Sequence, residues 1–177
     1  VRMRVIADHI RSSLMLMSDG VTPSNEGRGY VLRRLLRRSV RALRLLGIDN
    51  PTFDELFTTS YEAMVEAYPE LGESFDRVKR AAIQEESGFR KTLETGSAVL
   101  SEAIGKASKL LDGETAFLLH DPYGFPIDLT VEIAGESNLE VDRARFDELM
   151  QEQRDRAKAD SKAKKTGGAG LQVYSDF

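Results

Sequence analysis

Residues 28–46 have the sequence RGYVLRRLLRRSVRALRLL, which is the clearest helical pattern in the chain. Apolar side chains recur there every three or four residues and form one stripe, made up of Leu32, Leu35, Leu36, Val40, Leu43 and Leu46. Arginines at positions 33, 37, 41 and 44 follow the same period and line one flank. Gly47 comes directly after the stripe and is a typical left-handed helix stop. The stretch therefore predicts an amphipathic helix with a buried apolar face and a basic flank.

The same periodicity predicts helices on both sides of this one. They are expected over residues 1–18, 51–68, 71–111, 114–120 and 143–165, with Asn50 and Asp142 as N-terminal caps. Thr22 and Pro23 also have the pattern of a helix start. The segment HDPYGFP, residues 120–126, contains two prolines and one glycine, so it predicts a rigid loop. The expected fold class is all-α or mostly α, a multi-helix domain with a rigid Pro/Gly-rich loop and minor extended segments.

Length and composition fit such a domain. The chain has 177 residues, of which 41% are hydrophobic and 31% charged, a globular balance. We expect residues 1–165 to form the domain and residues 166–177, which contain three glycines, to form a linker. With no cysteine and only two histidines, we expect neither a disulfide nor a metal site. No apolar run approaches the roughly 20 residues of a membrane helix, so we expect no membrane partner and a cytoplasmic location. The start at Val1 rather than Met suggests a piece of a longer protein.

Positive charge is concentrated on the 28–46 helix, although the protein as a whole is acidic. The formal net charge is −4, yet no acidic residue lies between Glu26 and Asp49. Guanidinium groups match phosphate oxygens in shape and charge. We therefore expect six arginines to contact RNA phosphates: Arg28, Arg33, Arg34, Arg37, Arg38 and Arg41.

Two other interpretations of this helix are open. The arginines are equally compatible with ion pairs to acidic helices of the same chain, such as 54–66 or 84–94, in a helical scaffold or partner-binding domain. The helix could also be the recognition helix of a helix-turn-helix DNA binder, although such helices usually present Asn, Gln or Ser to base edges. Solvent exposure of the arginines distinguishes RNA or DNA binding from the scaffold.

Two loops contain further candidate residues. Asn25 lies in the segment PSNEGRGY, residues 23–30, where two glycines allow close approach of the backbone to a ligand. Asp121 lies at the start of the rigid loop over residues 120–126, directly before Pro122. Taken alone, both segments are also typical of ordinary capped turns. No nucleophile–base pair or phosphate-binding loop is present, so we expect no catalytic residue in this chain.

Several runs together resemble bacterial alanyl-tRNA synthetases. They are RVIADHIR (4–11), DGV (19–21), PSNE (23–26), RGYVLRR (28–34) with Arg37 and Arg38, LDGETAF (111–117), and YGFP (123–126) with Asp128-Leu129-Thr130. They occur in the order found in that family, and the resemblance covers residues 1 to about 165. One departure is Pro122, because family members usually have Thr before the YGFP run.

The resemblance implies the segment that directly follows the class II catalytic core and binds the acceptor stem of tRNA-Ala. It implies that Asn25 and Asp121 contact the G·U wobble pair of that stem, while the arginine helix supports the stem. The partners would be this stem and the enzyme's own catalytic and editing domains, with residues 166–177 leading toward the latter. ATP and Mg²⁺, and a zinc ion in the editing domain, would belong to the full-length ligase, and no cofactor is expected here.

The chemistry of the wobble pair agrees with these two residues. The guanine amino group has no partner within a G·U pair, and it points into the shallow minor groove of A-form RNA. A carboxylate such as Asp121 can accept from it, whereas an amide such as Asn25 can donate or accept. Because both must reach one base pair, we expect them near each other on one exposed surface, although 96 positions separate them.

Overall fold

Seven helices and one pair of two-residue strands make up residues 1–167, the part of the chain that the computed structural model describes. The elements are α1 (Arg2–Ser18), α2 (Gly27–Arg44), α3 (Phe53–Met64), α4 (Leu71–Lys106), β1 (Leu110–Leu111), α5 (Gly113–His120), α6 (Ile127–Glu136), β2 (Glu140–Val141) and α7 (Arg143–Gly167). The two strands pair in parallel. The predicted mostly α fold with minor extended segments is confirmed. None of the described helices is long and apolar enough to span a membrane.

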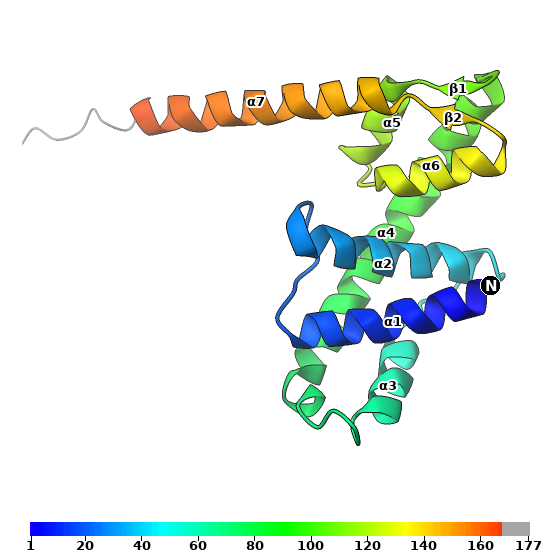
Figure 1. Ribbon diagram of the computed structural model, residues 1–177, viewed down its shortest axis with the longest axis vertical. Coiled ribbons are helices and arrows are strands. Elements are labelled where there is room, and N and C mark those ends of the chain that lie inside the picture. Colours follow the sequence, from blue (N-terminus) through cyan, green and yellow to red (C-terminus); the bar gives the residue numbers. More distant parts are fainter. Residues whose placement is uncertain (168–177) are drawn as a thin grey trace, which may run out of the picture.

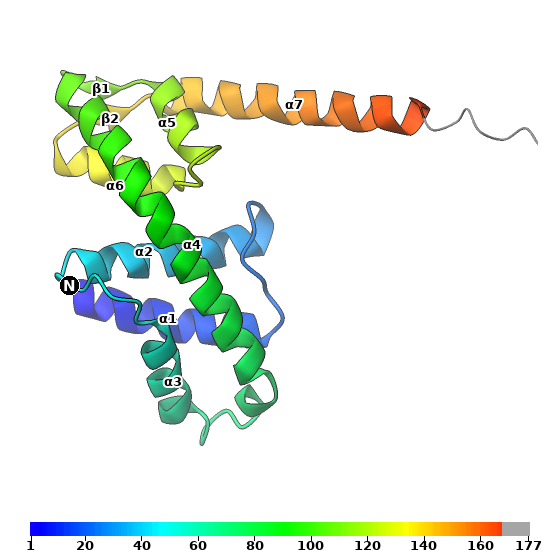
Figure 2. The ribbon, with the colours of Figure 1, turned by 180° about the vertical axis from the view of Figure 1, so that it is seen from behind.

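The first four helices pack around a common aliphatic core. In Figures 1 and 2, α1 and α2 lie side by side, α3 lies on the opposite side of α1 from α2, and α4 crosses the group diagonally. The apolar stripe of α2 enters this core through Leu32, Leu36, Val40 and Leu43, which are all buried. Leu46 is 39% exposed, contrary to the prediction, because α2 ends at Arg44 and Leu46 lies in the following turn. Gly47 has a φ of +81°, as a left-handed stop requires.

The predicted helix start at Thr22 and Pro23 is wrong, since α2 begins at Gly27. The segment before it turns back along the first turn of the helix. Ser24 donates its backbone N–H to the carbonyl of Gly29 at 3.2 Å. A Cβ atom on Gly29 would lie 2.3 Å from the carbonyl oxygen of Thr22, so only glycine allows this close approach.

The start of α3 is set by a residue from another helix. Asn50 was predicted as its cap, but α3 begins at Phe53 instead. Glu86 of α4 accepts from the backbone N–H groups of Thr52 and Phe53 at 2.8 and 3.0 Å, and it is only 2% exposed. A buried carboxylate from α4 therefore caps α3, which no local sequence pattern could indicate. The predicted end near Tyr68 is also too late, because α3 ends at Met64.

Helix α4 continues without interruption from the first group of helices into a second one (Figure 2). There its last turns contact α5, which in turn packs against α6 and α7, around Leu119, Phe125 and Leu129. Asp142 caps α7 as predicted, accepting from the N–H of Arg145 at 3.0 Å. Beyond this group, α7 extends away from the rest of the molecule (Figure 1). It includes the first two residues of the predicted 166–177 linker, and residues 168–177 lie outside the described part.

Candidate nucleic-acid interface

Asn25 and Asp121 line one pocket of about 590 Å³. Its walls come from the turn before α2, the loop after α5 and one face of α7. Besides these two residues, the lining residues are Glu26, Gly27, Tyr30, His120, Gly124, Ile127, Phe146, Asp147, Met150, Gln153 and Arg154. Asn25 and Asp121 are both exposed residues, so the pocket is open to a large ligand.

Asn25 is held by the helix that follows it. Arg33, two turns into α2, donates from Nη1 to the amide oxygen of Asn25. Among the described contacts, nothing bonds the amide nitrogen of Asn25, which therefore offers two N–H donors to the pocket.

Asp121 is held from the opposite side, by α7. Gln153 donates its amide N–H to Oδ1 of Asp121. The described contacts leave Oδ2 as a free acceptor at the pocket. The pocket thus presents one amide donor and one carboxylate acceptor on separate loops.

The loop that carries Asp121 is anchored by Phe125. Phe125 is fully buried, its ring centroid lies 5.9 Å from that of Phe89 on α4, and its N–H donates to Leu119 at 2.8 Å. Gly124 has a φ of +63° and accepts a hydrogen bond from Arg37 through its carbonyl. The predicted rigid loop is therefore fixed by burial and hydrogen bonding as well as by its prolines.

Most arginines of α2 form ion pairs inside the protein, which corrects the expectation of an open basic flank. Arg33, Arg37 and Arg41 have side chains only 22%, 12% and 10% exposed. Arg33 and Arg37 pair with Glu85, at 3.2 and 2.7 Å. The face they cover is the contact of α2 with α4 and α6, so acids far away in sequence neutralise them. Glu85 lies in the acidic segment 84–94 that the scaffold interpretation named.

The remaining arginines of the set are more accessible. Arg34 and Arg38 are 37% and 42% exposed and pair with Asp128 and Glu132 of α6, at 2.8 and 3.0 Å. Arg28 is exposed, and none of the ion pairs among the described side chains involves it.

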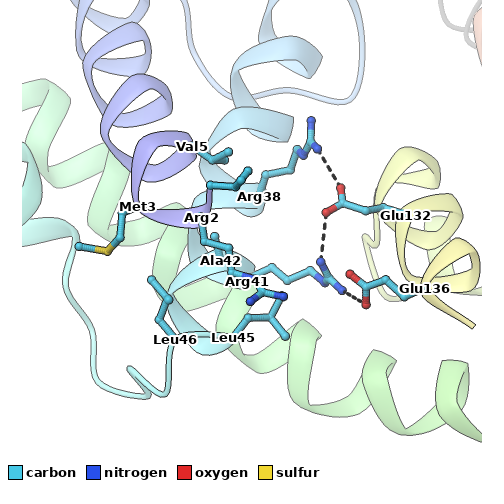
Figure 3. Close-up of a pocket in the computed structure, with 11 residues that line it drawn as sticks. Arg2, Met3, Val5, Arg38, Arg41, Ala42, Leu45, Leu46, Glu132 and Glu136 are labelled. Atoms are coloured by element: carbon cyan, nitrogen blue, oxygen red, sulfur yellow. Dashed lines mark hydrogen bonds and ion pairs between the residues drawn. The ribbon is translucent and has the colours of Figure 1, made fainter.

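A second cavity, of about 610 Å³, lies where α2 faces α6. Figure 3 shows Arg38 and Arg41 pointing across it at Glu132 and Glu136. Arg41 reaches Glu132 at 3.1 Å and Glu136 at 2.7 Å. The contact between α2 and α6 is thus largely ionic.

The protonation states around the first pocket follow from burial and these pairs. Burial lowers the pKa of His120, and a hydrogen bond with the backbone of Phe125 and the charge of Asp121 only partly oppose this, so the imidazole is neutral at pH 7. Burial raises the pKa of Asp128, but hydrogen bonds from Arg34 and Arg143 outweigh it and hold that pKa below its usual value. Burial also lowers the pKa of Arg37 while Glu85 raises it, and a guanidinium remains charged throughout the physiological range.

The contribution of α7 to the pocket was missed by the sequence analysis. Phe146, Met150 and Gln153 follow one another at intervals of four and three residues, so they share one face of the helix. That spacing is visible in the sequence, but nothing local indicates which element this face of the helix contacts. Tyr30, His120 and Arg154 were missed for lack of any local signal. Within the described residues, no group of three or more His, Cys, Asp or Glu is placed to hold a metal ion.

The chain matches a family model described as tRNA synthetases class II (A) over residues 1–176. The alanine–tRNA ligase of Clavibacter michiganensis subsp. michiganensis is 61% identical over 181 residues, which cover 100% of this chain and 20% of that protein. The enzymes of the same name from Leifsonia xyli subsp. xyli and Bifidobacterium longum are 60% and 55% identical over 99% and 100% of the chain, again covering 20% of each protein. The chain therefore spans 20% of the length of these relatives. Because the family model covers nearly every residue, the chain belongs to the class II (A) tRNA synthetase family.

Proposed function

We propose that this chain binds the acceptor stem of tRNA-Ala, and that Asn25 and Asp121 contact its G·U wobble pair. It would do so within a larger ligase that attaches alanine to tRNA with ATP and Mg²⁺. The observation that carries the proposal is the shared pocket, where two residues 96 positions apart offer a free donor and a free acceptor. The kinship with alanine–tRNA ligases supports tRNA as the partner.

The pocket chemistry explains how a wobble pair would be preferred. The free oxygen of Asp121 accepts from the guanine amino group, which a G·U pair leaves available in the minor groove. In a G·C pair one hydrogen of that amino group bonds the cytosine and the pyrimidine shifts, so the donor no longer fits the carboxylate. A polar group left unpaired in a binding site costs about 1–3 kcal/mol.

The arginines divide into two groups under this proposal. Arg28, Arg34 and Arg38 remain accessible enough to contact phosphates, and Arg154 of α7 adds a cation at the pocket. Arg33, Arg37 and Arg41 hold α2 against α4 and α6 instead. This division differs from the sequence-based expectation, in which all six arginines bound phosphates.

The ion pairs of the α2 arginines agree in part with the alternative of a helical scaffold, because such a scaffold would contain them. A scaffold alone, however, has no need of the free polar groups in the pocket. The DNA-binding alternative fits poorly, because α2 packs against α1 and α4 and is ion-paired to α6. The accessible part of α2 carries Arg28, Arg34 and Arg38, and not the Asn, Gln or Ser side chains that usually read base edges in a major groove.

We further propose that residues 1–165 are the recognition domain and that residues 166–177 begin the connection to an editing domain. In this assignment the ATP and Mg²⁺ site and the zinc site belong to other parts of the ligase. A purified chain should then show no alanine-dependent exchange of pyrophosphate into ATP, and measurable exchange would overturn the assignment.

The wobble contact is tested by binding two acceptor-stem RNA duplexes that differ only in a G·U or a G·C pair. The wild-type chain should prefer the G·U duplex, and Asp121→Ala should reduce that preference about tenfold by weakening the G·U complex alone. Asp147→Ala is the matched control, because Asp147 is an exposed carboxylate lining the same pocket. It should change both affinities equally. A preference that survives Asp121→Ala would contradict the proposed contact.

A further inference from the structure

Asn25 and Asp121 reach the pocket from two separate loops. In the part of the chain that the structure describes, no hydrogen bond joins the 21–26 loop directly to the 121–126 loop. A pocket that selects one kind of base pair needs a fixed distance between its hydrogen-bond donor and its acceptor. Something other than the loops themselves must therefore set that spacing.

Each loop is held by an arginine of α2. Arg33 donates from Nη1 to the side chain of Asn25. Arg37 donates from Nη1 to the carbonyl of Gly124, in the loop that begins at Asp121. The two arginines lie one helical turn apart, so the same face of α2 reaches both loops.

Both arginines converge on one carboxylate oxygen. Oε1 of Glu85 lies 2.7 Å from Nε of Arg37 and 3.2 Å from Nε of Arg33. The Arg37 contact is a hydrogen bond, whereas the Arg33 contact is an ion pair without hydrogen-bond alignment. The Glu85 side chain is only 12% exposed, and Arg37 also lies 5.0 Å above the ring of Phe89. Like charges four residues apart on a helix repel, so Glu85 is what allows these two guanidinium groups to sit together.

From these contacts we infer that Glu85 is a positioning residue: through Arg33 and Arg37 it sets the distance between Asn25 and the Asp121 loop. This inference rests on the proposed function, because it assigns Glu85 a part in selecting the wobble pair. Glu85 itself touches no RNA. It belongs to α4, and so it ties both loops to the longest rigid element of the fold.

Glu132 of α6 is a matched control. It also bridges two arginines of α2, Arg38 at 3.0 Å and Arg41 at 3.1 Å. Those arginines contact neither Asn25 nor the 121–126 loop among the described hydrogen bonds. Glu132→Gln therefore removes the same kind of charge from a partner of the same helix, α2, without touching the link between the two loops.

The first experiment measures binding of the G·U and G·C duplexes to the chain carrying Glu85→Gln or Glu132→Gln. Glu85→Gln should reduce the preference for G·U about tenfold and leave G·C binding within about twofold. Glu132→Gln should leave the preference unchanged. If wild type discriminates and Asp121→Ala abolishes the discrimination, but Glu85→Gln does not reduce it, only this inference is wrong. If wild type does not discriminate, the proposed function fails and the selectivity role of Glu85 fails with it.

A second measurement needs no RNA. In NMR spectra, Glu85→Gln should shift or broaden the side-chain amide signals of Asn25 and the backbone signal of Gly124, because both lose their anchors. Glu132→Gln should leave both signals in place. Unmoved signals in Glu85→Gln would overturn the positioning role regardless of any RNA result. If Glu85→Gln fails to fold, Arg33→Lys breaks the link to Asn25 alone and should move the Asn25 signals in the same way.

Discussion

Gly96 faces Phe125 at the point where α4 passes the loop that carries Asp121. A Cβ atom at position 96 would lie 2.8 Å from Cδ2 of Phe125, whose ring is fully buried. The ring therefore has little room to move away. The glycine costs the helix some stability, and its small size is what lets this loop pack against α4.

Gly96→Ala should lower the free energy of unfolding by about 1–3 kcal/mol, because the added methyl group overpacks the contact with Phe125. Gly88→Ala is the control, since Gly88 is also inside α4 but has no neighbour within 4 Å of the added atom. It should raise the free energy of unfolding by about 0.5–1 kcal/mol through helix propensity. Urea denaturation of both variants measures the difference. Equal stabilisation by both would show that the contact with Phe125 is not tight.

The candidate site was only partly predictable from individual residues. Neither Asn25 nor Asp121 stood out by pattern, and both were singled out by a family resemblance. The arginine pattern correctly predicted a helix flank but could not show what neutralises it. Glu85 is 48 positions from Arg37, and only the folded chain brings them together.

At the scale of elements, apolar periodicity predicted every long helix, because each buries one stripe against a neighbour. It failed where a boundary depends on a distant partner. Helix α3 starts where Glu86 accepts its first N–H groups, and α2 starts where the preceding segment folds back over Gly29. Which face of α7 lines the pocket could likewise not be predicted, because it depends on the position of α5 and the loop that follows it.

The capping of α3 gives a prediction at this scale. Glu86→Gln should lower the free energy of unfolding by about 0.5–2 kcal/mol, because an amide has one acceptor oxygen where the carboxylate offers two to Thr52 and Phe53. Asn50→Ala should have almost no effect, although local pattern pointed to Asn50 as the cap. Thermal unfolding followed by circular dichroism compares the two variants. A larger loss in Asn50→Ala would restore the local cap and contradict the tertiary one.

At the scale of the whole molecule, α4 is the continuous link between two groups of helices, and the contact of α2 with α6 is mainly ionic. Asp128 illustrates this contact: it accepts from Arg34 of α2 and Arg143 of α7, both at 2.8 Å. Each group also contains one partly buried histidine, His9 in α1 and His120 in α5. The two histidines make the stability of the molecule dependent on pH.

Burial is the main cause that lowers the pKa of both histidines below 6.5 in the folded chain. The unfolded chain therefore takes up protons first as the pH falls, so the stability due to the neutral imidazoles is present above about pH 6.5 and declines below it. The midpoint temperature of unfolding should decrease as the pH falls from 6.5 to 5, a window in which carboxylates such as Asp128 remain ionised.

His120→Gln should flatten part of this decline, because His9 is then the one histidine that remains. His120 packs edge-on against Phe146, with ring centroids 5.4 Å apart, and its burial outweighs the backbone of Phe125 and the carboxylate of Asp121, which favour the charged form. Melting temperatures of the wild type and His120→Gln across this window provide the measurement, with Gln151→Ala on the exposed surface of α7 as a control for surface changes. A decline of equal slope in all three proteins would mean that His120 is protonated as easily in the folded chain as in the unfolded one.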